Sequence, residues 1–189
     1  MARNTTAKKA EEPTVETSLD KSAVVLENSN EIDQPLNLEQ QVTVHNIARW
    51  PAVFQRLLTI GDVTVPKGGS IRLSRNEIIS QIHNNNTLFN GTDGKGSHAT
   101  LIVKDKATLE EVGFDPDKQF SEKAVKELFE ERDNKLFEVK LKDFIVTRAE
   151  KYSLMNAIVK LGINDFTKIR ICENYTGYKI DKIIDDSNR

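Results

Sequence analysis

The stretch Gln-Val-Thr-Val-His-Asn-Ile at residues 41–47 alternates apolar and polar side chains, and the packed part of the chain begins there. Alternation with a period of two is typical of a β-strand that buries one face. The same pattern recurs at Asp62–Val65 and, after Pro66-Lys67-Gly68-Gly69, at Ser70–Ser74. We therefore predict half-buried antiparallel strands over these segments, with a hairpin at residues 66–69.

The segment Ala52–Leu58 is compatible with a further strand, since Trp50-Pro51 before it favours an extended backbone. In this segment we expect Trp50 and Phe54 to belong to the core. His45, inside an alternating strand, is expected to be a surface or edge residue.

A short helix is predicted over Arg75–His83, because Ser74 is a good N-cap and the isoleucines at 78, 79 and 82 share one face. Three successive asparagines at 84–86 end it. A glycine-containing loop at Asn90–Ser97 then leads to a strand at Ala99–Val103, which closes a mostly β region over residues 41–105.

Helical spacing dominates the second half of the chain. Apolar residues between Phe120 and Phe129 repeat at helical intervals after Ser121, the predicted N-cap. The sequence Thr147-Arg148-Ala149-Glu150 is a capping box, and it opens a helix that ends at Gly162. The segment Phe137–Ile145 fits either a helix or a strand.

The last part of the chain is expected to be less regular. Asn164-Asp165 can start a further short helix, and Tyr175–Tyr178 is typical of a turn. The region 117–175 is thus mostly helical, a single α+β domain spans 41–180, and residues 181–189 form a polar tail that frays.

The first 40 residues differ from the rest of the chain. They carry four basic and eight acidic side chains, a net charge of −4, and they contain no aromatic residue. Such a segment buries too little apolar surface to offset its ordering entropy. We predict a long extended N-terminal arm, disordered alone and held by neighbouring subunits, with a solubilising tail as the alternative.

Composition excludes several classes of function. The formal net charge of −2 gives no cationic field for nucleic acid or anionic lipid, and the longest apolar runs fall short of a membrane span. Cys172 is the single cysteine, so it forms no intrachain disulfide, and it is expected to be a buried apolar residue. The start of the chain lacks the apolar core of a signal peptide.

No motif in the chain predicts catalysis or a cofactor. The three histidines are too far apart for a short metal motif, and the glycines of the 90–97 loop match neither phosphate-binding pattern. The loop is better explained as a turn that presents backbone to a neighbour, with His98 and Asp93 close enough to bond. We therefore predict a non-enzymatic protein without cofactors.

A nucleic-acid-binding accessory protein is the alternative from a different class. Its binding residues would be basic side chains of the C-terminal helices, interleaved with tyrosines. These residues are Lys151, Lys160, Lys168 and Arg170. Acidic neighbours interrupt this stripe, which makes nucleic acid the less favoured partner.

Five blocks of sequence, taken in order, resemble small virion-associated proteins of tailed bacteriophages. The resemblance spans about Gln41 to Gly177 and carries no catalytic signature. The blocks are Trp50-Pro51, Gly61–Pro66, Leu73–Ile78, Leu88–Ala99 and Ala149-Glu150-Lys151.

The resemblance implies a structural part of the head, neck or tail, such as a capsid, joining or decoration protein, located in the virion and assembled in the host cytoplasm. Its partners would be other virion proteins and copies of itself, with no membrane. Because apolar anchors in the arm and an exposed loop suit such contacts, we predict interaction residues in both. They are Val24, Val25, Leu26, Leu36 and Leu38 in the arm and Thr92, Asp93, Lys95 and His98 in the loop.

Overall fold

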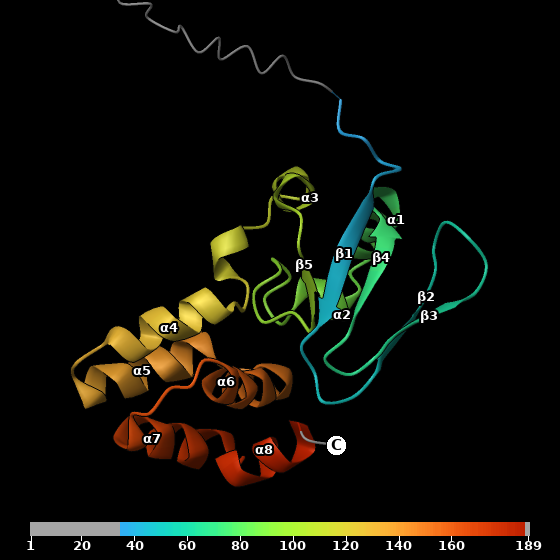
Figure 1. The fold of residues 1–189 in the computed structure, drawn as a ribbon. Helices are drawn as coiled ribbons and strands as arrows, with labels where there is room; N and C mark the ends of the chain where they lie inside the picture. The colour runs from blue at the N-terminus through green and yellow to red at the C-terminus, as the bar shows by residue number, and fades with distance from the viewer. Residues whose placement is uncertain (1–34, 188–189) are drawn as a thin grey trace, which may run out of the picture. The chain divides into compact units, whose positions relative to one another are not determined.

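The computed structural model describes residues 35–187, in which small antiparallel sheets are followed by a helical region (Figure 1). This confirms the predicted α+β class. The strands are β1 (Gln41–Asn46), β2 (Ala52–Gln55), β3 (Asp62–Val65), β4 (Ser70–Ser74) and β5 (Leu101–Val103). The helices are α1 (Arg75–His83), α2 (Thr87–Asn90), α3 (Lys106–Glu111), the 3-10 turn η1 (Pro116–Lys118), α4 (Glu122–Glu130), α5 (Asn134–Phe144), α6 (Arg148–Lys160), α7 (Phe166–Thr176) and α8 (Ile180–Ser187).

The larger sheet has the strand order β4-β1-β5, with both neighbours antiparallel to β1. The alternation at residues 42–46 places Val42 and Val44 in the core. Because β1 is the central strand, His45 lies on no edge; it is half-buried and its Nδ1 lies 2.9 Å from Ser70 Oγ. The expectation of a surface or edge histidine was therefore wrong on this point.

The smaller sheet is a ribbon of β2 and β3, paired in the register Ala52↔Val65 to Gln55↔Asp62. Residues 66–69 do form a turn, in which Gly69 N–H donates to Pro66 O at 3.0 Å. The predicted hairpin at this turn was wrong, however, because β3 pairs with β2 whereas β4 pairs with β1. The chain changes sheets there, and alternation alone does not specify which strands pair.

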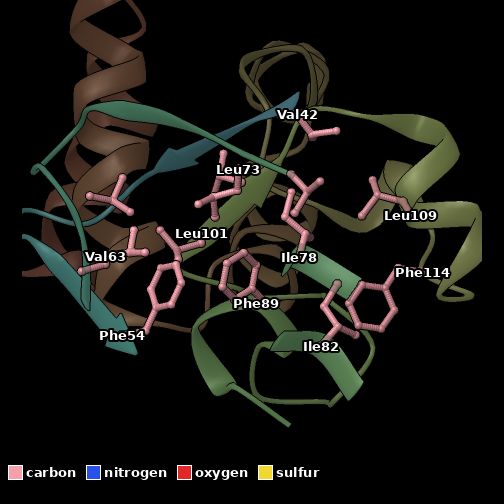
Figure 2. Packing of buried hydrophobic residues seen from close by; sticks show 14 residues of the cluster. Val42, Phe54, Val63, Leu73, Ile78, Ile82, Phe89, Leu101, Leu109 and Phe114 are labelled. Carbon is pink, nitrogen blue, oxygen red and sulfur yellow. The ribbon is translucent and has the colours of Figure 1, made fainter. Parts of the chain in front are cut away.

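The core of the β region lies between the two sheets and α1. Figure 2 shows Phe54 from the ribbon beside Phe89 from α2, and their rings meet edge to face at 5.3 Å. Ile78 and Ile82 reach the same cluster from one face of α1, as the isoleucine spacing predicts. Ser74 caps this helix by accepting the Glu77 N–H, which also confirms the predicted start.

A second core joins the helices around α6. Its capping box is present, with Thr147 and Glu150 bonding reciprocally, and the helix ends before Gly162 in a left-handed conformation with φ 62. The segment 137–145 is helical, since α5 buries Phe137 and Leu141 one turn apart. Burial also raises the pKa of the Cys172 thiol to about 12, so this cysteine is the buried apolar residue that we expected.

Three other expectations differ from the structure. Residues 180–187 form α8 instead of a frayed tail, because Ile183 is buried against α6. Trp50 is not a core residue; it is 37% exposed and lies beneath the Arg148 guanidinium at 5.5 Å. The predicted arm ends earlier than residue 40, because the chain divides between Pro35 and Leu36 and the backbone of residues 37–40 is bonded to α1.

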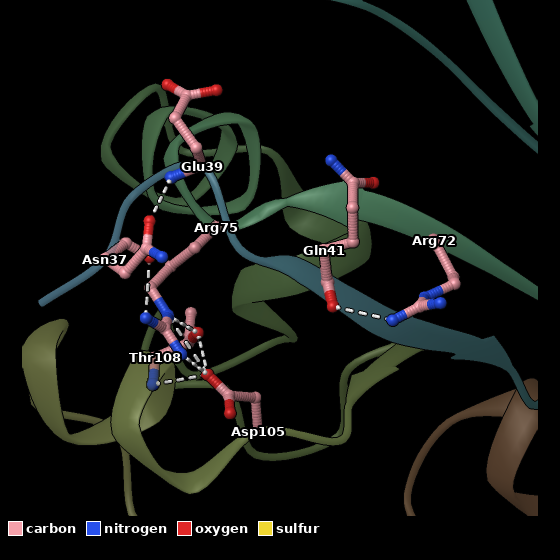
Figure 3. Close-up of polar contacts among 7 residues, drawn as sticks. All are labelled: Asn37, Glu39, Gln41, Arg72, Arg75, Asp105 and Thr108. Atoms are coloured by element: carbon pink, nitrogen blue, oxygen red, sulfur yellow. Dashed lines mark hydrogen bonds and ion pairs between the residues drawn. The ribbon is translucent and has the colours of Figure 1, made fainter.

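Arg75 makes the bonds that attach the start of the packed unit, at Asn37, to the rest of the fold (Figure 3). The side chain is almost fully buried, and its guanidinium donates to Asn37 O at 2.7 Å and to Asp105 Oδ2 at 2.9 Å. It also donates to Thr108 Oγ1 at 3.0 Å. One side chain of α1 thus connects the segment at Asn37 with the start of α3. Burial alone would raise the pKa of Asp105, but the bonds from Thr108 and Arg75 outweigh burial and lower it.

We expect Arg75→Met to destabilise the protein by about 3 kcal/mol, because it leaves a partly buried carboxylate without its cation. Urea denaturation measures this loss. The matched variant Arg72→Met removes an exposed arginine from β4 and should change stability by less than about 0.5 kcal/mol.

The deficit of Arg75→Met should also depend on pH. A carboxylate whose folded-state pKa is depressed contributes stability above its unfolded-state pKa, and the contribution is lost as pH falls through the folded value. The difference in stability between the wild type and Arg75→Met should therefore narrow as the pH falls below about 4, and the part that remains belongs to the bonds of Arg75 with Asn37 and Thr108, which do not titrate. A constant difference down to pH 2 would contradict the assignment to Asp105.

Candidate functional site

The loop between β2 and β3, residues 56–61, exposes a cluster of apolar side chains. We call this segment the tip loop. Its Leu57 and Leu58 are 44% and 48% exposed, and Ile60 is fully exposed at 103%. Figure 1 shows the loop at the outer end of the ribbon, away from α4 and α5. Apolar side chains gathered on a protruding loop are typical of a protein-interaction surface.

The ribbon carries the tip loop because its two faces differ. Ala52, Phe54, Val63 and Val65 alternate inward and are buried in the core of the β region. Val53 lies on the opposite face and is 55% exposed. One face thus anchors the ribbon, while the other is exposed and carries Val53 among polar side chains.

Asn46 fixes the base of the ribbon. Its side chain is completely buried at the end of β1, and its amide donates to the carbonyl oxygens of Trp50, Val65 and Pro66 at 2.8, 3.1 and 3.1 Å. Its own oxygen accepts the Ala48 N–H at 2.9 Å. Both strands of the ribbon therefore leave the larger sheet in a fixed direction.

Glu77 fixes the other end. From α1, its two carboxylate oxygens accept the backbone N–H groups of Leu57 at 2.9 Å and Leu58 at 3.2 Å. Gln81, one turn further along, donates to Glu77 at 2.8 Å and to Gln55 O at 2.7 Å. Asn86 in turn donates to Gln81 Oε1 at 2.8 Å. The start of the tip loop is therefore bonded to a helix of the core.

The carboxylate of Glu77 is kept ionised by these bonds. Burial by itself would raise its pKa, but the bonds from Gln81 and from the two backbone N–H groups together outweigh burial, so the pKa lies below its ordinary value. A charged acceptor binds backbone donors more strongly than a neutral one. The loop closes on itself as well, because Arg56 N–H donates to Gly61 O at 2.9 Å.

The glycine loop that we predicted as an interaction site is exposed only in part. Thr92, Asp93 and Lys95 are exposed, whereas His98 is half-buried and its Nδ1 lies 2.8 Å from Glu150 Oε1. His98 does lie near enough to Asp93 to interact with it electrostatically, but its Nδ1 bonds to Glu150, so this histidine joins the loop to the capping box of α6. Gly91 has a structural role, since an added Cβ would lie 1.8 Å from a backbone oxygen of Ser97.

The predicted arm residues divide into two groups. Val24, Val25 and Leu26 lie outside the described residues, so their role stays a prediction. Leu36 is half-buried and Leu38 is 42% exposed, and the Leu38 carbonyl accepts the Asn76 N–H at 2.9 Å. Leu38 thus lies at the attached start of the packed unit.

The four cations of the nucleic-acid alternative do not form a row of free charges. Lys168 is buried and donates to Phe129 O at 2.7 Å. Lys160 is bonded to Glu122 at 2.6 Å, and the Lys151 ammonium lies 4.4 Å from the centroid of the Tyr175 ring. Arg170 is exposed. The prediction that Lys168 faces phosphate was wrong, because the side chain points back into the helical core.

Residues 35–187 contain no group of three or more His, Cys, Asp or Glu side chains placed to hold a metal ion. Within the same range, every helix is too short or too polar to cross a membrane. Comparison with protein-family models, curated proteins and solved structures finds no match to this chain.

Sequence reasoning missed the tip loop because Leu57 and Leu58 continue the apolar pattern of the strand before them. The available signal was Thr59-Ile60-Gly61, an apolar residue between a polar residue and a glycine, which favours a turn there. No local pattern indicated that Glu77 binds the tip loop, because the backbone N–H groups that it accepts there lie 20 and 19 residues away.

We expect Glu77→Gln to release the tip loop without unfolding the protein. A neutral amide offers a single acceptor oxygen in place of two charged ones, so the amide protons of Leu57 and Leu58 should exchange with solvent at least tenfold faster. Hydrogen exchange followed by NMR measures this change. The control Glu110→Gln alters an exposed carboxylate of α3 and should leave both exchange rates unchanged.

Proposed function

We propose that this protein is a non-enzymatic structural component of a tailed-phage virion, which joins or decorates the head, neck or tail through protein–protein contacts. The observation that carries the proposal is the tip loop, where exposed apolar side chains stand on backbone bonded to the core. The resemblance of the sequence blocks to virion-associated proteins supports the class of particle.

Fixed geometry gives this surface its value in binding. A loop that is ordered before it meets a partner loses less conformational entropy on association, and so more of the apolar contact energy appears as affinity. The clamps at Asn46 and Glu77 supply that order. A tip loop exposed only to solvent would have no need of a buried carboxylate and a buried amide beneath it.

The nucleic-acid alternative receives less support. Of its four cations, Lys168 is buried and Lys160 is paired with Glu122, so few charges are left to neutralise phosphate. Phosphate affinity depends on the number of such contacts. A protein partner is therefore the better explanation of the exposed surfaces.

The test is incorporation into particles. We expect Ile60→Asp to reduce the amount of this protein in gradient-purified virions at least tenfold, because a charge at the apex of the tip loop must be desolvated in the contact. Immunoblots of purified particles against the total lysate measure it. Stability should change by less than about 0.5 kcal/mol, since the side chain is exposed.

Phe166→Asp provides the matched control. Phe166 is 83% exposed on α7, so it reports the effect of a charge at an exposed apolar side chain outside the tip loop. Incorporation should stay near the wild-type level. Normal incorporation of Ile60→Asp would contradict the proposed role of the loop.

A further inference from the structure

A cleft of about 880 Å³ lies between the larger sheet and the helical region. Its walls come from β1 and β5 on one side and from α6 and the segment before α4 on the other. This volume lies within the range of pockets that bind small ligands or short peptide segments. The tip loop and Glu77 contribute no residue to the cleft, whereas Asn46 belongs to its lining.

One face of α6 forms a wall of the cleft. Ser153, Asn156, Ala157 and Lys160 follow each other at intervals of three and four residues, the spacing that places side chains on one helix face. This face is turned toward the sheet, and Ser153 Oγ donates to Ile47 O at 3.0 Å. Lys160 is paired with Glu122, which leaves the Asn156 amide of this face available to the cleft.

Gln119 is the most informative residue of the lining. It is 5% exposed, and among the described residues its side-chain amide makes no hydrogen bond. The amide lines the cleft and is open to it. Asn156, half-buried across the cleft, likewise makes no side-chain hydrogen bond with residues 35–187. Both amides therefore present hydrogen-bonding groups to the cleft.

The charge in the cleft is positive. Lys104 is exposed at its rim and forms no ion pair with any described residue, whereas Lys160 is neutralised by Glu122. The pKa of His45 is lowered, first by burial and then by the nearby charges of Lys104 and Lys160, so the ring is neutral at pH 7. The lining also includes the apolar side chains of Ile102 and Phe120.

We propose that this cleft binds an extended peptide segment of a partner protein, one that carries an apolar side chain beside an acidic one. The two unpaired amides each offer a donor and an acceptor, which is the pattern that a peptide bond requires. Ile102 and Phe120 receive the apolar side chain, and Lys104 attracts the carboxylate. An anionic lipid or a phosphate would use the lysine but leave the amide acceptors without donors.

A labelled synthetic peptide tests the proposal on the full chain. The probe is the peptide Ala-Val-Val-Leu-Glu-Asn with a fluorophore on its N-terminus and an amide at its C-terminus. Its sequence occurs in this chain at residues 23–28. Fluorescence anisotropy should show saturable binding, and the NMR signals of the Gln119 and Asn156 side-chain amides should shift. A peptide with lysine in place of the glutamate should bind at least tenfold more weakly.

Two variants locate the site. Lys104→Glu should weaken binding at least tenfold, whereas Lys126→Glu, which changes an exposed lysine of α4 outside the cleft, should leave it within twofold. Gln119→Leu should weaken binding at least fivefold while its melting temperature stays equal or rises, because the variant removes an amide without a partner. A variant that lost binding by unfolding would show the opposite change in melting temperature.

Three outcomes would overturn the proposal: no saturable binding of the peptide, equal binding by Lys104→Glu, or tighter binding of inorganic phosphate than of the peptide. The proposal is independent of the tip loop, since Ile60→Asp should bind the peptide as the wild type does. Failure of the cleft and failure of the proposed function are therefore separate results.

Discussion

A two-stranded ribbon is only marginally stable in water, and the backbone of the loop at its end has few partners of its own. In this protein, the buried carboxylate of Glu77 supplies them by accepting the N–H groups of Leu57 and Leu58. Gln81 and Asn86 hold the carboxylate in place, so the loop inherits the rigidity of α1. The position of every exposed apolar side chain on the tip loop depends on this contact.

Nearly buried polar side chains also join segments at three other places in the fold. Asn46 joins the ribbon to the larger sheet, Arg75 joins the entry of the chain to α1 and α3, and Glu150 joins the glycine loop to α6. Each is a nearly buried polar side chain that bonds to backbone or to a second polar group. Buried polar groups of this kind favour one arrangement of segments, because any other arrangement leaves them without partners.

Local patterns predicted the elements of the fold better than their connections. The alternation at residues 42–46 and the Thr147–Glu150 capping box depend on neighbours in sequence, and both were confirmed. The pairing of β3 with β2 instead of β4 is a choice between distant segments that no local pattern encodes, and the bonds of Asn46 at the base of the ribbon are likewise non-local. The burial of Ile183 likewise depends on a surface of α6, and the polar residues around it gave the appearance of a free tail.

The candidate site was predicted only in part, for the same reason. The exposed glycine loop was found because glycines and polar residues mark loops directly, whereas the tip loop has the apolar composition of a strand. Gln119 and Asn156 are ordinary polar residues in sequence, and their lack of partners becomes visible only when the cleft around them is known. Lys168 shows the reverse case, a cation in a basic stripe that the fold buries.

Site-specific photo-cross-linking tests the central claim, that Glu77 holds the tip loop as a contact surface, most directly. A photoreactive amino acid at position 60 should form a covalent adduct with another subunit in assembled particles, and the additional change Glu77→Gln should lower the yield severalfold. The same probe at position 164, an exposed residue between α6 and α7, should give little adduct. Adducts from position 164 but none from position 60 would contradict the account.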